Sequence, residues 1–196
     1  TSSDHNTSEQ YYFSVNEENP KHKLIQKREK GIIYSVNSWN DSFYMHTNKD
    51  AEDFKIEKTK DINFKKWDTY VPAKDETLIG GLTFLKNWEI RSEVTNALGK
   101  IFVKNLKDNN EEELIFSDEE VFDGGVSLVQ KDRNTDLIHI SYSTPKTQSR
   151  VYLYNLRTKE KKLVKEQIIP SGHNSNDYVV ERLECLSHDG RKVPLT

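Results

Sequence analysis

Short runs of β-branched and aromatic residues recur along the chain, and polar turn residues separate them. The clearest example lies between Leu137 and Lys165, where three such runs alternate with polar breaks. This pattern predicts an antiparallel meander. The run 151–156 is apolar on both faces, because Val151 and Leu153 alternate with Tyr152, Tyr154 and Leu156. A strand of this kind needs cover on both sides, and we expect neighbouring repeats to provide it.

The same order of runs recurs upstream at a spacing of 45 to 50 residues. The second runs begin at Phe43, Trp88 and Leu137, the third runs at Phe54, Ile101 and Val151, and the outer runs are 67–71, 113–116 and 162–165. This period, with four strands in each unit, is typical of propeller blades. The sequence therefore predicts an all-β fold, a partial β-propeller of four-stranded antiparallel blades. A β-sandwich is the alternative, and chance similarity among β-rich segments is a third interpretation.

The repeat also predicts how the chain is divided. We expect a partial propeller over 1–169 that comprises part of a blade at 10–30 and three complete blades at about 32–72, 78–117 and 126–166. Residues 170–196 read as a linker followed by the start of a strand, with a hairpin turn at Asp189–Gly190. Because the chain begins in mid-repeat and stops within an expected strand, we expect it to be a fragment of a larger protein.

Composition narrows the function classes. The net charge of −3, without a basic stretch that is interleaved with aromatic residues, gives no reason to expect nucleic-acid binding. No apolar run approaches the roughly 20 residues that span a bilayer, so no membrane segment is expected. The single cysteine, Cys185, excludes an internal disulfide and fits a reducing compartment. Together with a polar N-terminus that lacks a signal-peptide pattern, this predicts a cytoplasmic location.

Candidate metal ligands are scattered along the sequence. His46 and His139 occupy similar places in two repeats, but without a His-x-x-x-His or paired-Cys spacing they are interpreted as ordinary strand histidines. Cys185 and His188 are too isolated for a zinc half-site, and the acidic run at 108–113 lacks the glycine of a calcium loop. We therefore expect no metal and no cofactor. The tryptophans are expected to fill space between sheets rather than to form a binding surface; they are Trp39, Trp67 and Trp88.

Several stretches carry a family resemblance. Residues 42–56, 141–160, 178–183 and 189–196 resemble the prolyl oligopeptidase family of serine peptidases, and within it the oligopeptidase B (protease II) group. The likeness covers nearly the whole chain in the family's order. It implies a cytosolic hydrolase in which a seven-bladed propeller caps an α/β-hydrolase domain. By this resemblance, the chain is the second half of the propeller plus the strand that re-enters the hydrolase domain from Tyr178 onward.

The catalytic part of that family is not found in this sequence. A Gly-x-Ser-x-Gly elbow would expose the nucleophile, and the nearest stretch, 124–129, lacks the last glycine. No catalytic residue is assigned, the substrate-binding residues are unknown, and we predict no peptidase activity from these 196 residues alone. The resemblance implies that the propeller gates the access of short peptides with basic residues to a hydrolase domain of the same parent protein. Tyr178, Glu181 and Arg182 fall where the chain crosses between domains, so they are either hinge residues or exposed decoration of a strand.

Two further expectations concern partners. A free-standing, non-catalytic propeller-like scaffold for interactions is the alternative function, and it would be marked by a native polypeptide that ends near Thr196. In either case, terminal blades would present apolar faces that a neighbour normally covers. We therefore predict a homodimer or larger assembly through these faces.

Overall fold

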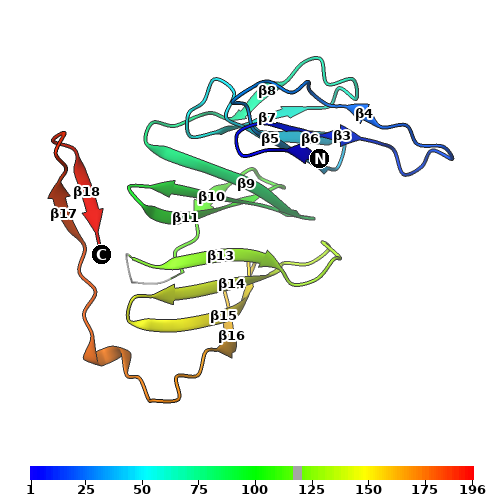
Figure 1. Ribbon diagram of the computed structural model, residues 1–196. Coiled ribbons are helices and arrows are strands. Elements are labelled where there is room, and N and C mark those ends of the chain that lie inside the picture. Colours follow the sequence, from blue (N-terminus) through cyan, green and yellow to red (C-terminus); the bar gives the residue numbers. More distant parts are fainter. Residues whose placement is uncertain (117–120) are drawn as a thin grey trace. The chain divides into compact units, whose positions relative to one another are not determined.

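The computed structural model describes residues 1–116 and 121–196, and these form a chain made almost wholly of β-strands (Figure 1). The chain divides into two compact units, Thr1–Leu82 and Thr83–Thr196. Within the described ranges, three four-stranded antiparallel sheets follow one another along the sequence, and the strands of each sheet keep their chain order. The predicted all-β class and the four-stranded repeat are therefore confirmed.

The strands of the three sheets have the following bounds. The first sheet contains β5 (Tyr34–Trp39), β6 (Ser42–Thr47), β7 (Lys55–Thr59) and β8 (Asp68–Val71). The second sheet contains β9 (Thr77–Leu85), β10 (Trp88–Thr95), β11 (Leu98–Asn105) and β12 (Glu111–Glu113). The third sheet contains β13 (Asp123–Leu128), β14 (Leu137–Thr144), β15 (Thr147–Asn155) and β16 (Lys161–Glu166).

Shorter elements flank these sheets. At the N-terminal side, β1 (Ser2–Ser3) pairs with β2 (Ser8–Glu9), and β3 (Tyr11–Tyr12) pairs with β4 (Lys23–Leu24). At the C-terminal side lie a 3₁₀ turn, η1 (Ser175–Asp177), and the hairpin of β17 (Leu183–Leu186) and β18 (Lys192–Leu195). The boundary between the two units falls within β9.

The core of the first unit forms where the alternating apolar residues of its strands turn inward. Met45 of β6, Ile56 of β7 and Ile79 of β9 are each no more than 1% exposed. Aromatic rings extend this core toward β3: Tyr12, Phe43 and Phe64 meet edge-to-face at centroid distances of 5.0 to 5.9 Å. Such contacts add to the stabilisation that burial alone gives.

His46 of β6 is a structural part of this unit. Its Nε2 lies 2.7 Å from the Ile79 carbonyl oxygen, and its ring stacks on Phe54 at a centroid distance of 4.5 Å. Burial lowers the pKa of His46 below its ordinary value of 6.5, which the hydrogen bond to Ile79 partly opposes. A neutral imidazole whose Nε2–H donates to a carbonyl explains this position without a metal.

The core of the second unit lies between the second and third sheets. The apolar faces of β14 and β15 pack against β10 and β11, and the most deeply buried members are Leu85, Val103, Ile138, Ile140 and Leu156. The run 151–156 behaves as its pattern predicts on one face, since Tyr152, Tyr154 and Leu156 belong to this core. Val151 and Leu153 alternate to the opposite face of β15, where they are half-buried.

The outer strand of the second sheet differs from its predicted position. The apolar run 113–116 was the expected strand, but the strand observed is Glu111–Glu113. Glu111 receives two hydrogen bonds of 2.9 Å from the Arg91 guanidinium, which ties this segment to β10. Leu114 and Phe116 instead turn into the core. The predicted end of this blade at residue 117 lies outside the described residues.

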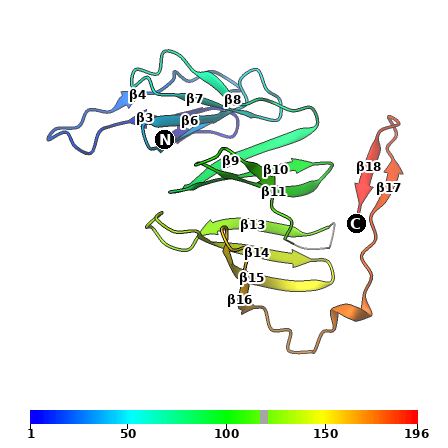
Figure 2. The same ribbon diagram turned by 180° about the vertical axis from the view of Figure 1, so that it is seen from behind.

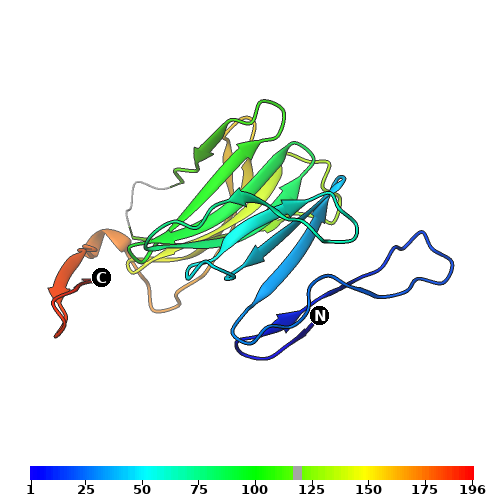
Figure 3. The same ribbon diagram turned by 90° about the horizontal axis from the view of Figure 1, so that it is seen from above.

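The N-terminal strands are shorter than the sequence pattern indicated. Within the expected part-blade at 10–30, the apolar runs 11–15 and 23–27 would form longer strands, whereas the ladder holds only Tyr11–Leu24 and Tyr12–Lys23 pairs. Val15 is 83% exposed, so its side chain has no core to pack against. The loop between β3 and β4 extends away from the rest of the first unit (Figure 3).

The meander gives the second unit two distinct ends. The turns 86–87, 106–110 and 156–160 lie at one end, here called the far end. The turns 96–97 and 145–146 lie at the other, where β16 also ends and the chain leaves the third sheet (Figure 2). We call this second end the linker end, and residues 167–182 the linker.

Candidate functional site

The linker starts at the edge of the third sheet and stays attached to it for one residue. The Gln167 amide donates to the Ser149 carbonyl at 2.8 Å, which extends the β15–β16 ladder past the end of β16. Beyond this point the described backbone is irregular until η1. Ile168 is 84% exposed, so its side chain does not pack against the core of the second unit.

The middle of the linker returns to the linker end of the third sheet. His173 Nε2 lies 2.7 Å from the Lys146 carbonyl oxygen in the turn between β14 and β15. The His173 ring stacks against Tyr178 at 5.3 Å between centroids with an interplanar angle of 25°. In the sequence between His173 and Tyr178, the Asn174 side chain accepts a hydrogen bond from the Asn176 amide and caps η1. This small local cluster therefore holds Tyr178, which is still 55% exposed.

The end of the linker reaches the neighbouring sheet. The Arg182 guanidinium donates to the Asn96 carbonyl oxygen in the turn between β10 and β11. Glu181 is exposed, and among the described residues it has no ion-pair partner. The structure thus places Arg182 against the linker end of the second sheet. Tyr178 contacts His173, which in turn reaches the linker end of the third sheet, and Glu181 has no contact of either kind among the described residues.

The strand that the pattern predicted from Tyr178 onward begins later. Residues 178–182 are irregular, and β17 starts only at Leu183. Stacking of Tyr178 and the contact of Arg182 with Asn96 use side chains that would otherwise alternate along a strand. The expected hairpin is present, with Gly190 at a φ of +81° in its turn.

An ion pair links the two strands of the C-terminal hairpin, and the apolar side chains of the hairpin are exposed. Glu184 and Lys192 form an ion pair of 2.8 Å across it. This hydrogen bond lowers the pKa of Glu184 and raises the pKa of Lys192. Leu183 and Leu186 are 58% and 73% exposed, and the free thiol of Cys185 is exposed as well. The hairpin therefore presents apolar side chains without a core of its own.

A hollow in the first unit has a strongly acidic lining. It occupies about 690 Å³ between the β6–β7 loop and the connection from β8 to β9. Five carboxylates and one lysine line it: Asp50, Glu52, Asp53, Asp75, Glu76 and Lys74. The β6–β7 loop occupies the same place in its sheet as the turns 96–97 and 145–146 in theirs. Positively charged groups would be favoured in this hollow.

The described residues contain neither a metal cluster nor a membrane-spanning helix. Over 1–116 and 121–196, no group of three or more His, Cys, Asp or Glu side chains is placed to share a metal ion. Within these ranges there is also no helix of the length and apolar character needed to cross a bilayer. His139 lies in β14 opposite Ser127 and Leu153 of the adjacent strands, as an ordinary strand residue does.

Comparison with known proteins identifies the family. The sequence profile of the "Prolyl oligopeptidase, N-terminal beta-propeller domain" matches residues 1–167. The chain therefore belongs to the prolyl oligopeptidase family, and the three four-stranded sheets are part of a β-propeller domain of that family.

Individual relatives agree with this placement. Dipeptidyl aminopeptidase BI of Pseudoxanthomonas mexicana is 28% identical over 177 residues, which are 88% of this chain and 24% of the relative. Protease 2 of Moraxella lacunata is 23% identical over 195 residues, 28% of its length. Oligopeptidase B of Trypanosoma brucei, in a closed form with covalently bound antipain, superposes with a TM-score of 0.84 at 27% identity and covers 96% of this chain. The chain thus spans about a quarter of the relatives that it matches.

The sequence pattern missed the partners of the linker. His173 sits in a Pro-Ser-Gly-His-Asn stretch that reads only as a loop, and Asn96 and Lys146 are ordinary turn residues. Their carbonyl groups become acceptors because both turns lie at the same end of adjacent sheets. The spacing of the repeat predicts that all turns between second and third strands lie at one end, but it does not predict which of these turns the linker contacts.

Proposed function

We propose that this chain is part of the propeller that controls the entry of short peptides to the hydrolase domain of a serine peptidase. The observation that carries the proposal is the match of 167 residues to the propeller domain of the prolyl oligopeptidase family. In this proposal the sheets perform no chemistry. They exclude folded proteins from an active site whose Ser, Asp and His lie in another part of the parent protein.

The hinge of this peptidase is proposed to be the linker. Its contacts with the sheets are few and exposed to water, which supports opening without a change in the sheets themselves. Tyr178 and Arg182 are proposed to hold the closed arrangement, and Glu181 is proposed to pair with a cation of the hydrolase domain. The exposed apolar side chains of the C-terminal hairpin support its proposed role as the start of that domain.

A preference for basic peptides is the finer part of the proposal. The five carboxylates around the hollow in the first unit support it, because they would attract Lys and Arg side chains. In the parent peptidase, replacing Glu52 by Gln and Asp75 by Asn together should raise KM for a basic peptide by about threefold. The KM of a neutral peptide should not change. Equal changes for both peptides would remove this part of the proposal.

The first experiment is to determine the size of the native polypeptide with an antibody raised against this chain. A protein several times longer than 196 residues is expected. The purified long form should cleave a short peptide with a basic residue, leave folded proteins intact and be blocked by a serine-directed inhibitor. The 196-residue chain should show no turnover. A native band near 22.9 kDa would overturn the proposal in favour of a free-standing scaffold.

Association of the isolated chain is a separate proposal. The half-buried face of β15 that carries Val151 and Leu153, with Leu163 and Val164 exposed on β16, would be partly covered in a dimer. Light scattering of the 196-residue chain is expected to show a homodimer or a larger assembly. A monomer at high concentration would contradict this.

A further inference from the structure

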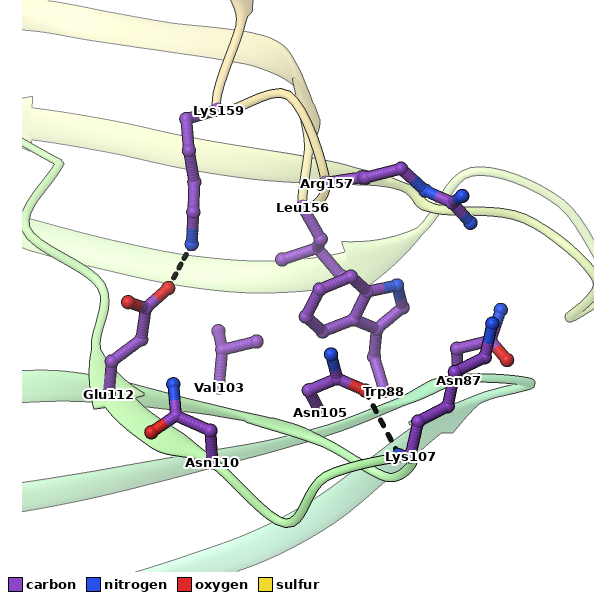
Figure 4. A pocket seen from close by; sticks show the side chains of 10 residues that line it. All are labelled: Asn87, Trp88, Val103, Asn105, Lys107, Asn110, Glu112, Leu156, Arg157 and Lys159. Carbon is purple, nitrogen blue, oxygen red and sulfur yellow. Dashed lines mark hydrogen bonds and ion pairs between the residues drawn. The ribbon is translucent and has the colours of Figure 1, made fainter.

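A cavity of about 390 Å³ lies at the far end of the second unit, away from the linker. Figure 4 shows the side chains that line it, which come from the second sheet and from the turn between β15 and β16. The size is within the range of small-ligand sites. Nothing in the proposed gating role uses this cavity, because the linker contacts the opposite end of the sheets.

The floor of the cavity is apolar and rigid. Val103 and Leu156 are 1% and 0% exposed and belong to the core, and the Trp88 ring lies beside them (Figure 4). Trp88 Nε1 donates to Asp136 Oδ1 at 2.7 Å, which fixes the orientation of the indole. Because the indole N–H is already used, the ring offers its apolar surface to a ligand.

The walls carry more positive than negative charge. Three cations, Lys107, Arg157 and Lys159, face one carboxylate, Glu112. Arg157 is paired with Asp136 at 2.7 Å and Lys159 with Glu112. Among the described residues, Lys107 has no ion-pair partner. The cavity therefore keeps one cation that is not neutralised.

A neutral hydrogen-bonding residue, Asn87, lies on the turn next to this cation, and Asn110 lies on the side of Glu112 (Figure 4). The Leu106 amide donates to the Asn87 carbonyl at 2.9 Å, so Asn87 and Lys107 lie on adjacent turns. In Figure 4, these two residues lie on one side of the Trp88 ring, and Lys159 and Glu112 lie on the other. Within the described ranges, the carboxamides of Asn87 and Asn110 have no hydrogen-bond partner. A carboxylate at Lys107 would have a charged donor and an amide donor within one site.

We propose that this cavity binds a free carboxylate attached to an apolar or aromatic group, such as the C-terminal residue of a short peptide. The carboxylate pairs with Lys107 and accepts from Asn87, and the apolar group lies on the partly buried Trp88 ring, which packs beside the buried Leu156. This site does not depend on the proposed gating function, since none of its lining residues belongs to the linker.

The test uses the 196-residue chain and a matched pair of probes. N-acetyl-L-phenylalanine carries the carboxylate, and N-acetyl-L-phenylalaninamide is the neutral isostere. The acid should shift the indole N–H resonance of Trp88 in ¹H–¹⁵N spectra, with a Kd about tenfold lower than that of the amide. Raising the salt concentration should weaken the binding of the acid and leave the binding of the amide unchanged.

Variants assign the effect to the cavity. Lys107→Gln should raise the Kd of the acid by about tenfold and leave that of the amide unchanged. Lys165→Gln, an exposed lysine on β16, serves as the matched control and should bind like the parent chain. Both replacements lie on the surface, and circular dichroism verifies that each variant is folded.

Three results would overturn the proposal. The first is an acid and an amide that bind equally well, and the second is the absence of any Trp88 shift at millimolar acid. The third is an equal loss of acid binding in Lys107→Gln and Lys165→Gln, which would indicate attraction to the surface as a whole. Each of these outcomes leaves the peptidase proposal untouched, because the size of the native polypeptide decides that separately.

Discussion

The two ends of the second unit are built from the same sheets but are held in different ways. At the far end, Asp136 accepts from both Trp88 and Arg157, at 2.7 and 2.8 Å, directly beside the buried Leu156. The Lys86 amide also donates to the Arg133 carbonyl at 2.9 Å. At the linker end, two side chains reach single carbonyl groups of turns, and both contacts are exposed to water.

This difference predicts different local stabilities. Contacts at the far end rest on the core, so breaking them costs both the hydrogen bonds and the packing of the residues beneath. Exposed polar contacts contribute little, and segments held by them open at small free-energy cost. The far end is therefore expected to stay fixed while the linker end opens, which is the division of roles that a hinged propeller needs.

The largest effect is expected at the core beneath the far end. Leu156→Ala should lower the free energy of unfolding of the second unit by about 2–5 kcal/mol, because Leu156 is fully buried and its loss leaves a cavity. Urea denaturation followed by tryptophan fluorescence measures this. Leu163→Ala, at a side chain that is 44% exposed, is the control and should cost less than about 1 kcal/mol. Similar losses in both variants would contradict the proposed contrast.

A smaller loss of unfolding free energy is expected when Asp136, which accepts hydrogen bonds from both Trp88 and Arg157, is replaced. Asp136→Asn replaces the carboxylate that pairs with Arg157 and accepts from Trp88, and should cost about 1–3 kcal/mol. The same urea experiment measures the loss, and the indole N–H resonance of Trp88 should shift. Asp41→Asn, in an exposed turn, should change neither quantity.

At the linker end, kinetics rather than global stability should respond. Arg182→Ala removes the contact with the Asn96 carbonyl and should change the free energy of unfolding by less than about 0.5 kcal/mol. Limited proteolysis within 167–182 should become about threefold faster, because the linker opens more often. Arg191→Ala, at an exposed arginine of the hairpin, should not alter the cleavage rate. A linker that resisted proteases equally in both variants would show that Arg182 does not hold it.

The smallest effect concerns pH and the hairpin. The pKa of Glu184 is lowered from 4.5 by its hydrogen bond to Lys192, so near this pH the unfolded hairpin binds more protons than the folded one. Its stabilisation is present above pH 4.5 and is lost as the pH falls through the lowered pKa. The protection factors of the β17 and β18 amides should fall over this range. Glu184→Gln should remove the dependence, and a dependence that survived in this variant would assign it to another group.

Much of the fold could be predicted from local pattern. The apolar pattern placed β6 and β14 correctly: β14 has one buried face and one more open face, whereas β6 has buried residues on both faces. The pattern was wrong where a side chain found a distant partner. Glu111 pairs with Arg91 and lies in the outer strand, ahead of the apolar run that was expected there. Tyr178 stacks on His173 and Arg182 binds the turn at Asn96, and neither residue extends β17.

The features of the candidate sites also divide into those that local sequence patterns predict and those that depend on distant contacts. The sequence by itself determined the four-stranded repeat and the family, because periodicity, turn residues and family motifs are local features of the chain. Only the tertiary structure decided which turns meet. The cavity beside Trp88 joins residues from positions 87 to 159, and the linker binds Asn96 and Lys146, which no local pattern marks. These contacts depend on how adjacent sheets stack, and that arrangement is set by the buried side chains between them.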